Sequence, residues 1–177
     1  PHLCWHPDFV AHGSCRICTV KVGGRAGAAC TVQAAEGLEV ESNTEELNAH
    51  RKTLLQMLFV EGNHFCPSCE KSGHCRLQAS AYADGIEGPH FEEFYPDRPL
   101  DASHPDLLLD FNRCILCELC VRASRQIDGK AVFGFTGRGS GKRLACNAES
   151  GLGGTSAAAD DRAIAACPTG LWKPTIE

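Results

Sequence analysis

Residues 112–120 read Asn-Arg-Cys-Ile-Leu-Cys-Glu-Leu-Cys, and the C-x2-C-x2-C triplet within them decides the fold class. Three thiols spaced by two residues can converge on one metal centre, whereas zinc rarely uses three cysteines this close together. Far downstream, Cys167 and Pro168 form a Cys-Pro pair. The triplet and the remote pair together predict a 4Fe–4S cluster held by four thiolates, here called the triplet site.

The number of clusters at the triplet site follows from its spacing. In bacterial ferredoxins the triplet continues with x3-Cys-Pro, and that fourth cysteine serves a second cluster. Here Ser124 stands at the position after x3, and no second triplet precedes the Cys-Pro pair. A single cubane is therefore expected at this motif. Its predicted ligands are Cys114, Cys117, Cys120 and Cys167.

Another cysteine group, the N-terminal site, lies near the start of the chain with the pattern C-x10-C-x2-C-x11-C. Plant-type ferredoxins hold a 2Fe–2S cluster with C-x4-C-x2-C and a distant fourth cysteine, so the first gap is longer here. Gly13 and Ser14 suit a loop whose backbone N–H groups approach sulfur. The pattern favours 2Fe–2S, with a four-cysteine zinc site as the alternative. The predicted ligands are Cys4, Cys15, Cys18 and Cys30.

The remaining group, the His64 site, has the pattern H-x-C-x2-C-x5-C, so three cysteines need a fourth ligand. His64 stands two residues before the first cysteine. His74 is the rival, but a residue adjacent to a ligand usually points away from the same metal. The site is either a second 4Fe–4S cluster or a zinc site with three cysteines and one histidine. The predicted ligands are His64, Cys66, Cys69 and Cys75.

The composition supports metal thiolates over disulfides. Twelve cysteines among 177 residues are clumped as C-x2-C pairs, which is typical of metal sites in a reducing, cytoplasmic compartment. The chain has no apolar signal region and no apolar run long enough to span a membrane, and its net charge of −5 gives no reason to expect nucleic-acid binding.

The remaining cysteine and histidines match no ligand or catalytic motif. Cys146 is left over and is interpreted as a small apolar residue. We interpret the other histidines as structural or solvated. No phosphate-binding loop or Ser/His/Asp pattern occurs, so the sequence predicts a chain without catalytic residues of its own. The histidines interpreted in this way are His2, His6, His12, His50, His90 and His104.

The predicted fold class is α+β. Residues 17–22 and 28–32 are expected to pair as strands around Gly23-Gly24, with another strand over 38–41. A helix is expected from an Asn43 cap, with Glu46 at the third helical position, to Gly62. The Gly-rich stretch 134–161 is expected to be a mobile loop.

Four segments follow from these expectations. They are a 2Fe–2S ferredoxin-like domain over 1–42, a helix with the His/Cys cluster segment over 43–83, a connection over 84–105, and a 4Fe–4S ferredoxin-like domain over 106–177.

The order of the three sites resembles a known family. A 2Fe–2S site, a His/Cys site and a triplet with remote Cys-Pro occur in the N-terminal region of the large iron–sulfur subunit of respiratory complex I. Iron-only hydrogenases and NAD-linked formate dehydrogenases share the module. Residues 59–75, FVEGNHFCPSCEKSGHC, and residues 112–117, NRCILC, are similar to small diaphorase subunits (HoxU type) of soluble NAD-reducing nickel–iron hydrogenases.

This resemblance implies an electron-transfer subunit within a larger assembly. A flavin-bearing diaphorase partner would exchange hydride with NAD, and this chain would carry single electrons between the flavin and nickel–iron hydrogenase subunits. FMN, NAD and the nickel–iron centre would belong to the partners. The family's ferredoxin-like domain normally begins earlier with a strand hairpin, so an incomplete β-grasp sheet is expected here. The alternatives are the equivalent module of complex I or of a formate dehydrogenase, and a zinc-stapled module without redox function.

Overall fold

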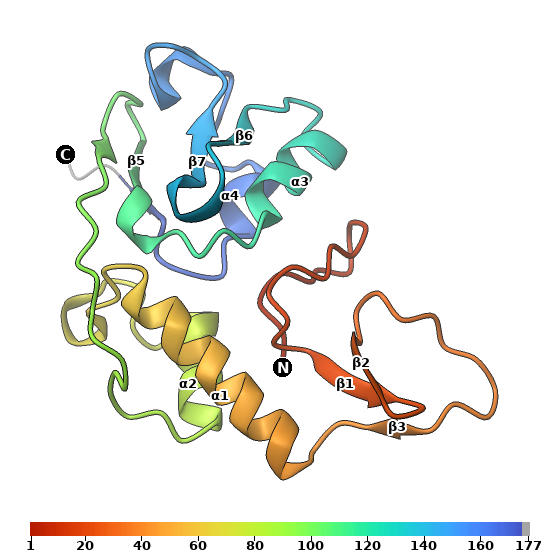
Figure 1. Ribbon diagram of the computed structural model, residues 1–177. Coiled ribbons are helices and arrows are strands. Elements are labelled where there is room, and N and C mark those ends of the chain that lie inside the picture. Colours follow the sequence, from red (N-terminus) through yellow and green to blue (C-terminus); the bar gives the residue numbers. More distant parts are fainter. Residues whose placement is uncertain (175–177) are drawn as a thin grey trace.

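The computed structural model describes residues 1–174 and combines short helices with small antiparallel sheets (Figure 1). The predicted mixed helix and strand class is therefore confirmed. The β-grasp topology and the segment boundaries stay predictions. None of the helices within the described residues combines the length and apolar character that crossing a bilayer requires.

The first sheet is a three-stranded sheet near the N-terminus, with the order β2-β1-β3. Gly23 and Gly24 both have positive φ, and Val22 pairs directly with Arg25 across them. Because this two-residue turn reverses the chain at once, the return strand ends at Ala28, and the predicted strand over 28–32 was placed too late. The strands are β1 (Thr19–Val22), β2 (Arg25–Ala28) and β3 (Val40–Glu41).

Helix α1 (Glu45–Val60) follows this sheet and is capped by Thr44, whose Oγ1 accepts a hydrogen bond of 3.3 Å from the N–H of Leu47. The predicted cap, Asn43, is wrong by one residue, because its side chain instead accepts a bond from Asn48 Nδ2. Helix α1 packs against α2 (Arg76–Ala83). The two helices and the first sheet form the lower body in Figure 1.

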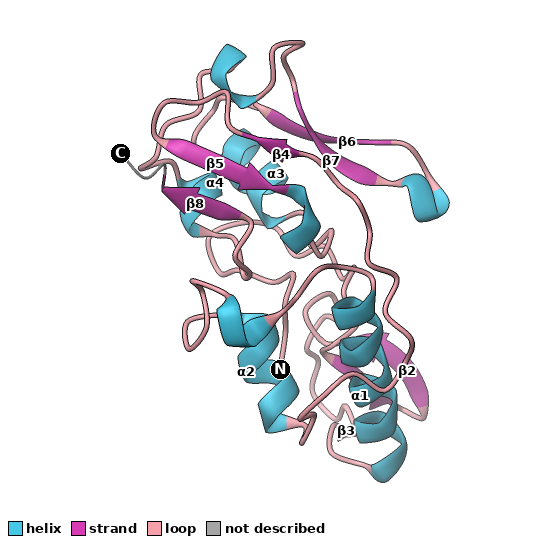
Figure 2. Cartoon of the chain, turned by 90° about the vertical axis from the view of Figure 1, so that its left-hand side faces the viewer, coloured by secondary structure: helices cyan, strands magenta, loops and turns pink. Residues whose placement is uncertain are grey.

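The upper body carries two more small sheets and two helices, as Figure 2 shows from the side. One sheet has the order β4-β5-β8, and β4 lies within the predicted connection 84–105. The predicted loop over 134–161 is wrong in its first half, because β6 and β7 pair as a hairpin there. Gly137, with φ of 72°, turns that hairpin. The remaining elements are β4 (Leu100–Asp101), β5 (Leu107–Asp110), α3 (Leu119–Gln126), β6 (Phe133–Thr136), β7 (Arg143–Cys146), α4 (Arg162–Ala165) and β8 (Trp172–Pro174).

The N-terminal segment joins the two bodies. Leu3 is buried in the core formed with α1 and α2, whereas its neighbour Cys4 is buried in the core of the upper body. Cys15 and Ile115 pack against both cores. Both views place this segment between the bodies (Figures 1 and 2). The fold therefore brings the first cysteines of the chain to the triplet region.

Candidate metal centres

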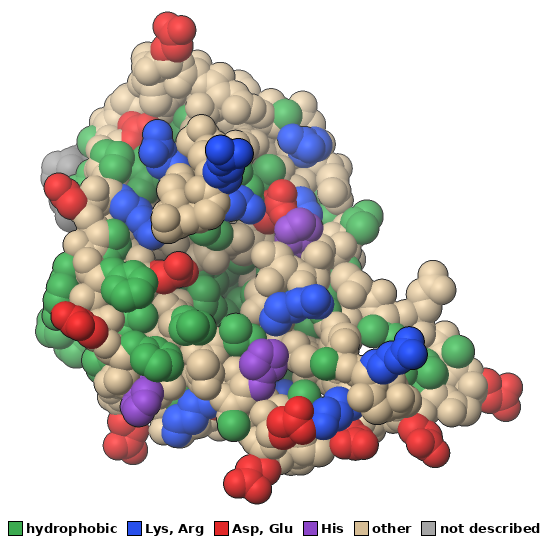
Figure 3. Space-filling view, viewed as in Figure 1, with side chains coloured by type: hydrophobic (Ala, Val, Ile, Leu, Met, Phe, Trp, Pro, Cys, Tyr) green, Lys and Arg blue, Asp and Glu red, His purple; other side chains and the backbone are tan. Residues whose placement is uncertain are grey.

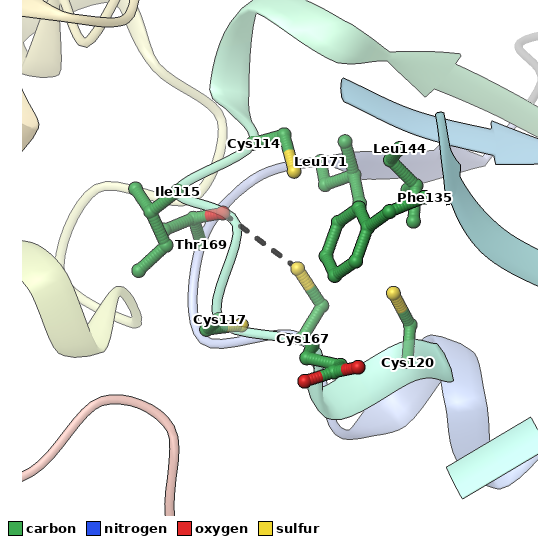
Figure 4. A pocket seen from close by; sticks show the side chains of 10 residues that line it. Cys114, Ile115, Cys117, Cys120, Phe135, Leu144, Cys167, Thr169 and Leu171 are labelled. Carbon is green, nitrogen blue, oxygen red and sulfur yellow. Dashed lines mark hydrogen bonds between the residues drawn. The ribbon is translucent and has the colours of Figure 1, made fainter. Parts of the chain in front are cut away.

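The cysteine triplet and the remote Cys167 meet around one small cavity. Cys114 and Cys117 lie on the loop before α3, Cys120 lies in its first turn, and Cys167 follows α4 (Figure 4). Apolar side chains close the rest of the cavity and keep water from it. These side chains are Ile115, Phe135, Leu144 and Leu171.

The loop around this cavity is bent by two residues in left-handed conformation, Leu116 and Glu118, with φ of 54° and 65°. This geometry directs the backbone N–H groups of Leu116 and Leu119 at the sulfurs of Cys114 and Cys117. Amide donors stabilise the negative charge of ligand sulfur, so the strained loop fits a thiolate-bound cluster.

Burial governs the acidity of these thiols. It raises the pKa of Cys114 to about 11 and raises that of Cys117 well above its usual value, and in both cases the charge of Cys167 adds to the effect. Burial and the neighbouring Cys117 likewise raise the pKa of Cys120. Metal binding requires thiolates, so loading of this site releases protons and replaces them with the positive charge of iron.

The His64 site is a small cavity beside α1 and α2. His64 lines it, and its Nε2 is fully buried without a hydrogen-bond partner among the described residues. An unpartnered buried nitrogen is costly, and a metal ligand is the role that would satisfy it. His74 is exposed and lines a different pocket. The other cavity residues include the three cysteines of the group, Cys66, Cys69 and Cys75.

The surroundings of His64 keep its ring neutral. Burial, followed by the charges of Arg113 and Arg98, lowers the pKa of His64 to about 4. A neutral imidazole is the form that coordinates metal. Arg113 also donates a hydrogen bond from Nη1 to Cys69 Sγ at 2.7 Å, and a carboxylate oxygen of Asp110 lies 3.2 Å from its Nε. The His64 site therefore has a charged donor aimed at one of its sulfurs.

The N-terminal site is drawn together from three segments of the chain. The N–H of Cys15 lies 3.3 Å from Cys4 Sγ. The pKa of Cys4 is lowered to about 5, first because the Cys15 thiol donates a hydrogen bond to it. The pKa of Cys30 is raised to about 11 by burial, by its hydrogen bond with Cys18 and by the charges of Cys18 and Cys4. The Cys4–Cys15 and Cys18–Cys30 pairs are thus linked through the charge of Cys4 acting on Cys30.

The donor sets of two sites fit cubane clusters. All twelve cysteines are free thiols. Within residues 1–174, no three Cys, His, Asp or Glu side chains converge closely enough for a single metal ion. Four ligands spread around a cavity suit a cubane, in which each ligand binds a separate iron atom. The residues of the triplet site and of the His64 site fit such a cluster.

Several residues that shape these sites carry no sequence signal. Thr169 connects the start of the triplet loop to Cys167, because its hydroxyl donates to the carbonyl of Arg113 at 2.8 Å and lies 3.6 Å from Cys167 Sγ. Arg122 reaches from α3 to the N-terminal segment. Cys146 lies in β7 and does not line the triplet cavity.

Three family models match consecutive parts of the chain. Residues 1–45 match a 2Fe-2S iron-sulfur cluster binding domain. Residues 51–90 match the NADH-ubiquinone oxidoreductase-G iron-sulfur binding region, and residues 105–172 match the ferredoxin-like domain of NADH-quinone oxidoreductase subunit 3. The predicted cofactors, 2Fe–2S and 4Fe–4S clusters, are thereby confirmed.

One solved structure decides the family. The crystal structure of an NAD+-reducing [NiFe]-hydrogenase in the H2-reduced state contains a chain that is 56% identical, with a TM-score of 0.94. The match covers 98% of this chain and 74% of that one. The chain belongs to this hydrogenase family. Within the family, it is similar to the gamma subunit of the NAD-reducing hydrogenase HoxS of Cupriavidus necator, with 43% identity over 150 residues.

The resemblance seen in the sequence is thus confirmed. More distant members of the wider group include the alpha subunit of the NADPH-Fe(3+) oxidoreductase of Geobacter sulfurreducens, which is 30% identical over 180 residues. The matched region spans 64% of the HoxS gamma chain and 20% of the Geobacter chain.

Proposed function

We propose that this chain is the electron relay of an NAD-linked hydrogenase. One 2Fe–2S and two 4Fe–4S clusters, held by the three ligand sets predicted from the sequence, would supply one-electron transfer between a flavin- and NAD-binding diaphorase partner and nickel–iron hydrogenase subunits. The chain supplies the cluster ligands, excludes water from the clusters and places hydrogen-bond donors at the ligand sulfurs.

The observation that carries this proposal is the central position of the triplet site. On one side, Cys4 of the N-terminal site packs in the same core as Cys117 and Cys120, and the charge of Cys4 raises the pKa of Cys117. On the other side, Arg113, the residue before Cys114, binds Cys69 of the His64 site. These contacts favour a relay in which the triplet site stands between the N-terminal site and the His64 site.

One face of the molecule supports a partner beside the His64 site. Phe65, Tyr82 and Phe94 are between 63% and 69% exposed, and the first two line a pocket that His64 and Cys66 also line. Hydrophobic side chains gather on the left of Figure 3, where the segment 84–99 runs past α1 in Figure 1. Such a patch beside a redox site is typical of a subunit interface.

A second candidate function has its own support. The Geobacter NADPH-Fe(3+) oxidoreductase chain aligns with 96% of this chain, so the same relay could serve an NAD(P)H-linked oxidoreductase without a nickel–iron partner. The relay is common to both candidates, and only the terminal partner differs.

The test is anaerobic purification of the protein with its partners, followed by iron, sulfide, zinc and nickel analysis and EPR of the reduced sample. About ten irons per chain, with one 2Fe–2S and two 4Fe–4S signals, are expected. Co-purifying nickel and flavin would support the hydrogenase, and flavin without nickel would support the second candidate. Zinc in place of iron and sulfide would refute the relay.

A further inference from the structure

Arg122 on α3 is a buried arginine that fastens the N-terminal segment to the upper body. The residue is only 8% exposed. Nη1 donates to the carbonyl of Val10 at 2.6 Å, and Nη2 donates to the carbonyl of Cys4. The guanidinium also lies over the ring of Phe9, 5.0 Å from its centroid. The side chain thus clamps both ends of the stretch 4–10.

The charge of this arginine has no counter-ion within residues 1–174. Among the ion pairs of that part of the chain, none includes Arg122, and its Nε is buried without a hydrogen-bond partner. Both carbonyl acceptors are neutral. A buried cation without a compensating charge is strongly destabilising, so a negative group is expected within its reach.

The N-terminal site is the candidate for this negative group, because Cys4, whose carbonyl accepts the hydrogen bond from Nη2, is one of its predicted ligands. A 2Fe–2S cluster with four thiolates carries net negative charge, which grows by one unit on reduction. A loaded N-terminal site would therefore supply the counter-charge that Arg122 lacks among the described residues.

We propose that Arg122 is a positioning residue with two linked effects on electron transfer, an inference that rests on the proposed function. Its positive charge favours the reduced state of the 2Fe–2S cluster and so raises that cluster's potential. Its two hydrogen bonds fix Cys4 against the helix that carries Cys120, so the 2Fe–2S cluster is held at a set distance from the triplet cluster. One side chain thereby sets both the driving force and the spacing of the transfer between these two clusters.

The experiment compares three variants of the whole protein purified with its partners. Arg122→Gln removes the charge, Arg122→Lys keeps the charge but loses the fork that binds two carbonyls, and Arg125→Gln removes an exposed arginine from the same helix. Two EPR readouts are used. Redox titration gives the potential of each cluster, and the relaxation enhancement of the 2Fe–2S signal by the reduced triplet cluster reports the distance between them.

We expect Arg122→Gln to shift the 2Fe–2S potential to more negative values, by more than it shifts the His64-containing cluster, and to weaken the relaxation enhancement. Arg122→Lys should keep the potential near that of the parent protein and still weaken the enhancement. Arg125→Gln should change neither. If Arg122→Gln does not assemble, Arg122→Lys still tests the inference through the relaxation enhancement alone.

Two results would overturn the inference. The first is a parent protein with all its iron and sulfide in which the Arg122 variants retain both the potential and the enhancement. The second is an equal shift in the Arg125→Gln control, which would mean that any lost positive charge on α3 has the same effect. A parent protein without iron and sulfide would overturn the proposed function itself, and this inference with it.

Discussion

Arg113 and Cys69 are 44 positions apart in the sequence, yet Arg113 Nη1 lies 2.7 Å from Cys69 Sγ. The backbone of the same arginine continues into Cys114, and its carbonyl accepts a hydrogen bond from Thr169, whose hydroxyl lies near Cys167. One residue therefore contacts the ligand sets of two centres. Its side chain acts on the His64 site, while its main chain belongs to the triplet loop.

Replacing Arg113 by Gln should lower the potential of the His64-containing cluster. A hydrogen bond to a charged group contributes roughly 1.5 kcal/mol, which corresponds to a shift of about 60 mV for one electron. Redox titration monitored by EPR measures the change. Arg138→Gln, at an exposed position without a side-chain partner in the described structure, is the matched control and should leave every potential in place. An unchanged potential in Arg113→Gln would show that the contact does not tune the cluster.

His64→Cys should retain the cluster of the His64 site but lower its potential, because a thiolate replaces a neutral ligand. His64→Ala should lose or destabilise that cluster, since the position of the buried Nε2 is left empty. The same substitution at His74, whose ring is exposed on another surface, should leave the EPR spectrum unchanged. If His74→Ala affects the cluster and His64→Ala does not, His74 is the ligand and the assignment of His64 is wrong.

Cys167→Ala should abolish or cripple only the triplet cluster, with a loss of up to about four irons per chain. Cys146→Ala removes a half-buried thiol of β7 outside the cavity and should leave the iron content intact. Iron analysis and EPR on both variants distinguish the two cysteines. A full set of signals in Cys167→Ala would refute the pairing of this cysteine with the triplet.

Gly62→Ala should disturb the His64 site through sterics alone. A Cβ at this position would lie 2.6 Å from His64 Nε2 and 2.8 Å from the carbonyl of Asn112, so the ring has to move. We expect a loss of roughly 1–3 kcal/mol in stability and an altered signal from the cluster of this site. Thermal unfolding and EPR report the two effects. Gly88→Ala, which meets no atom within 4 Å, is the control, and an equal effect there would contradict the steric explanation.

The sequence by itself determined the cofactor class, and it predicts how the cysteines are grouped. Spacings such as C-x2-C-x2-C are local, and local spacing limits which thiols can reach one centre. The same holds for α1, whose capping residues lie within a few positions of its start, so the prediction missed the cap by only one residue. The glycine-rich composition of residues 134–161 led to a wrong prediction of a loop in the first half of this stretch. A hairpin needs only two short pairing strands around Gly137, and glycine content alone does not exclude them.

Only the tertiary structure decided how the three sites are connected. Arg122 meets the carbonyl of Cys4 from 118 positions away, and Arg113 meets Cys69 from 44 positions away. Neither contact has a signature in the sequence, because the sequence around an arginine does not show whether its side chain is exposed or buried against two carbonyls. Such pairings depend on which core buries each segment. Leu3 and Cys4 enter different cores, and this brings the N-terminal cysteines beside the triplet.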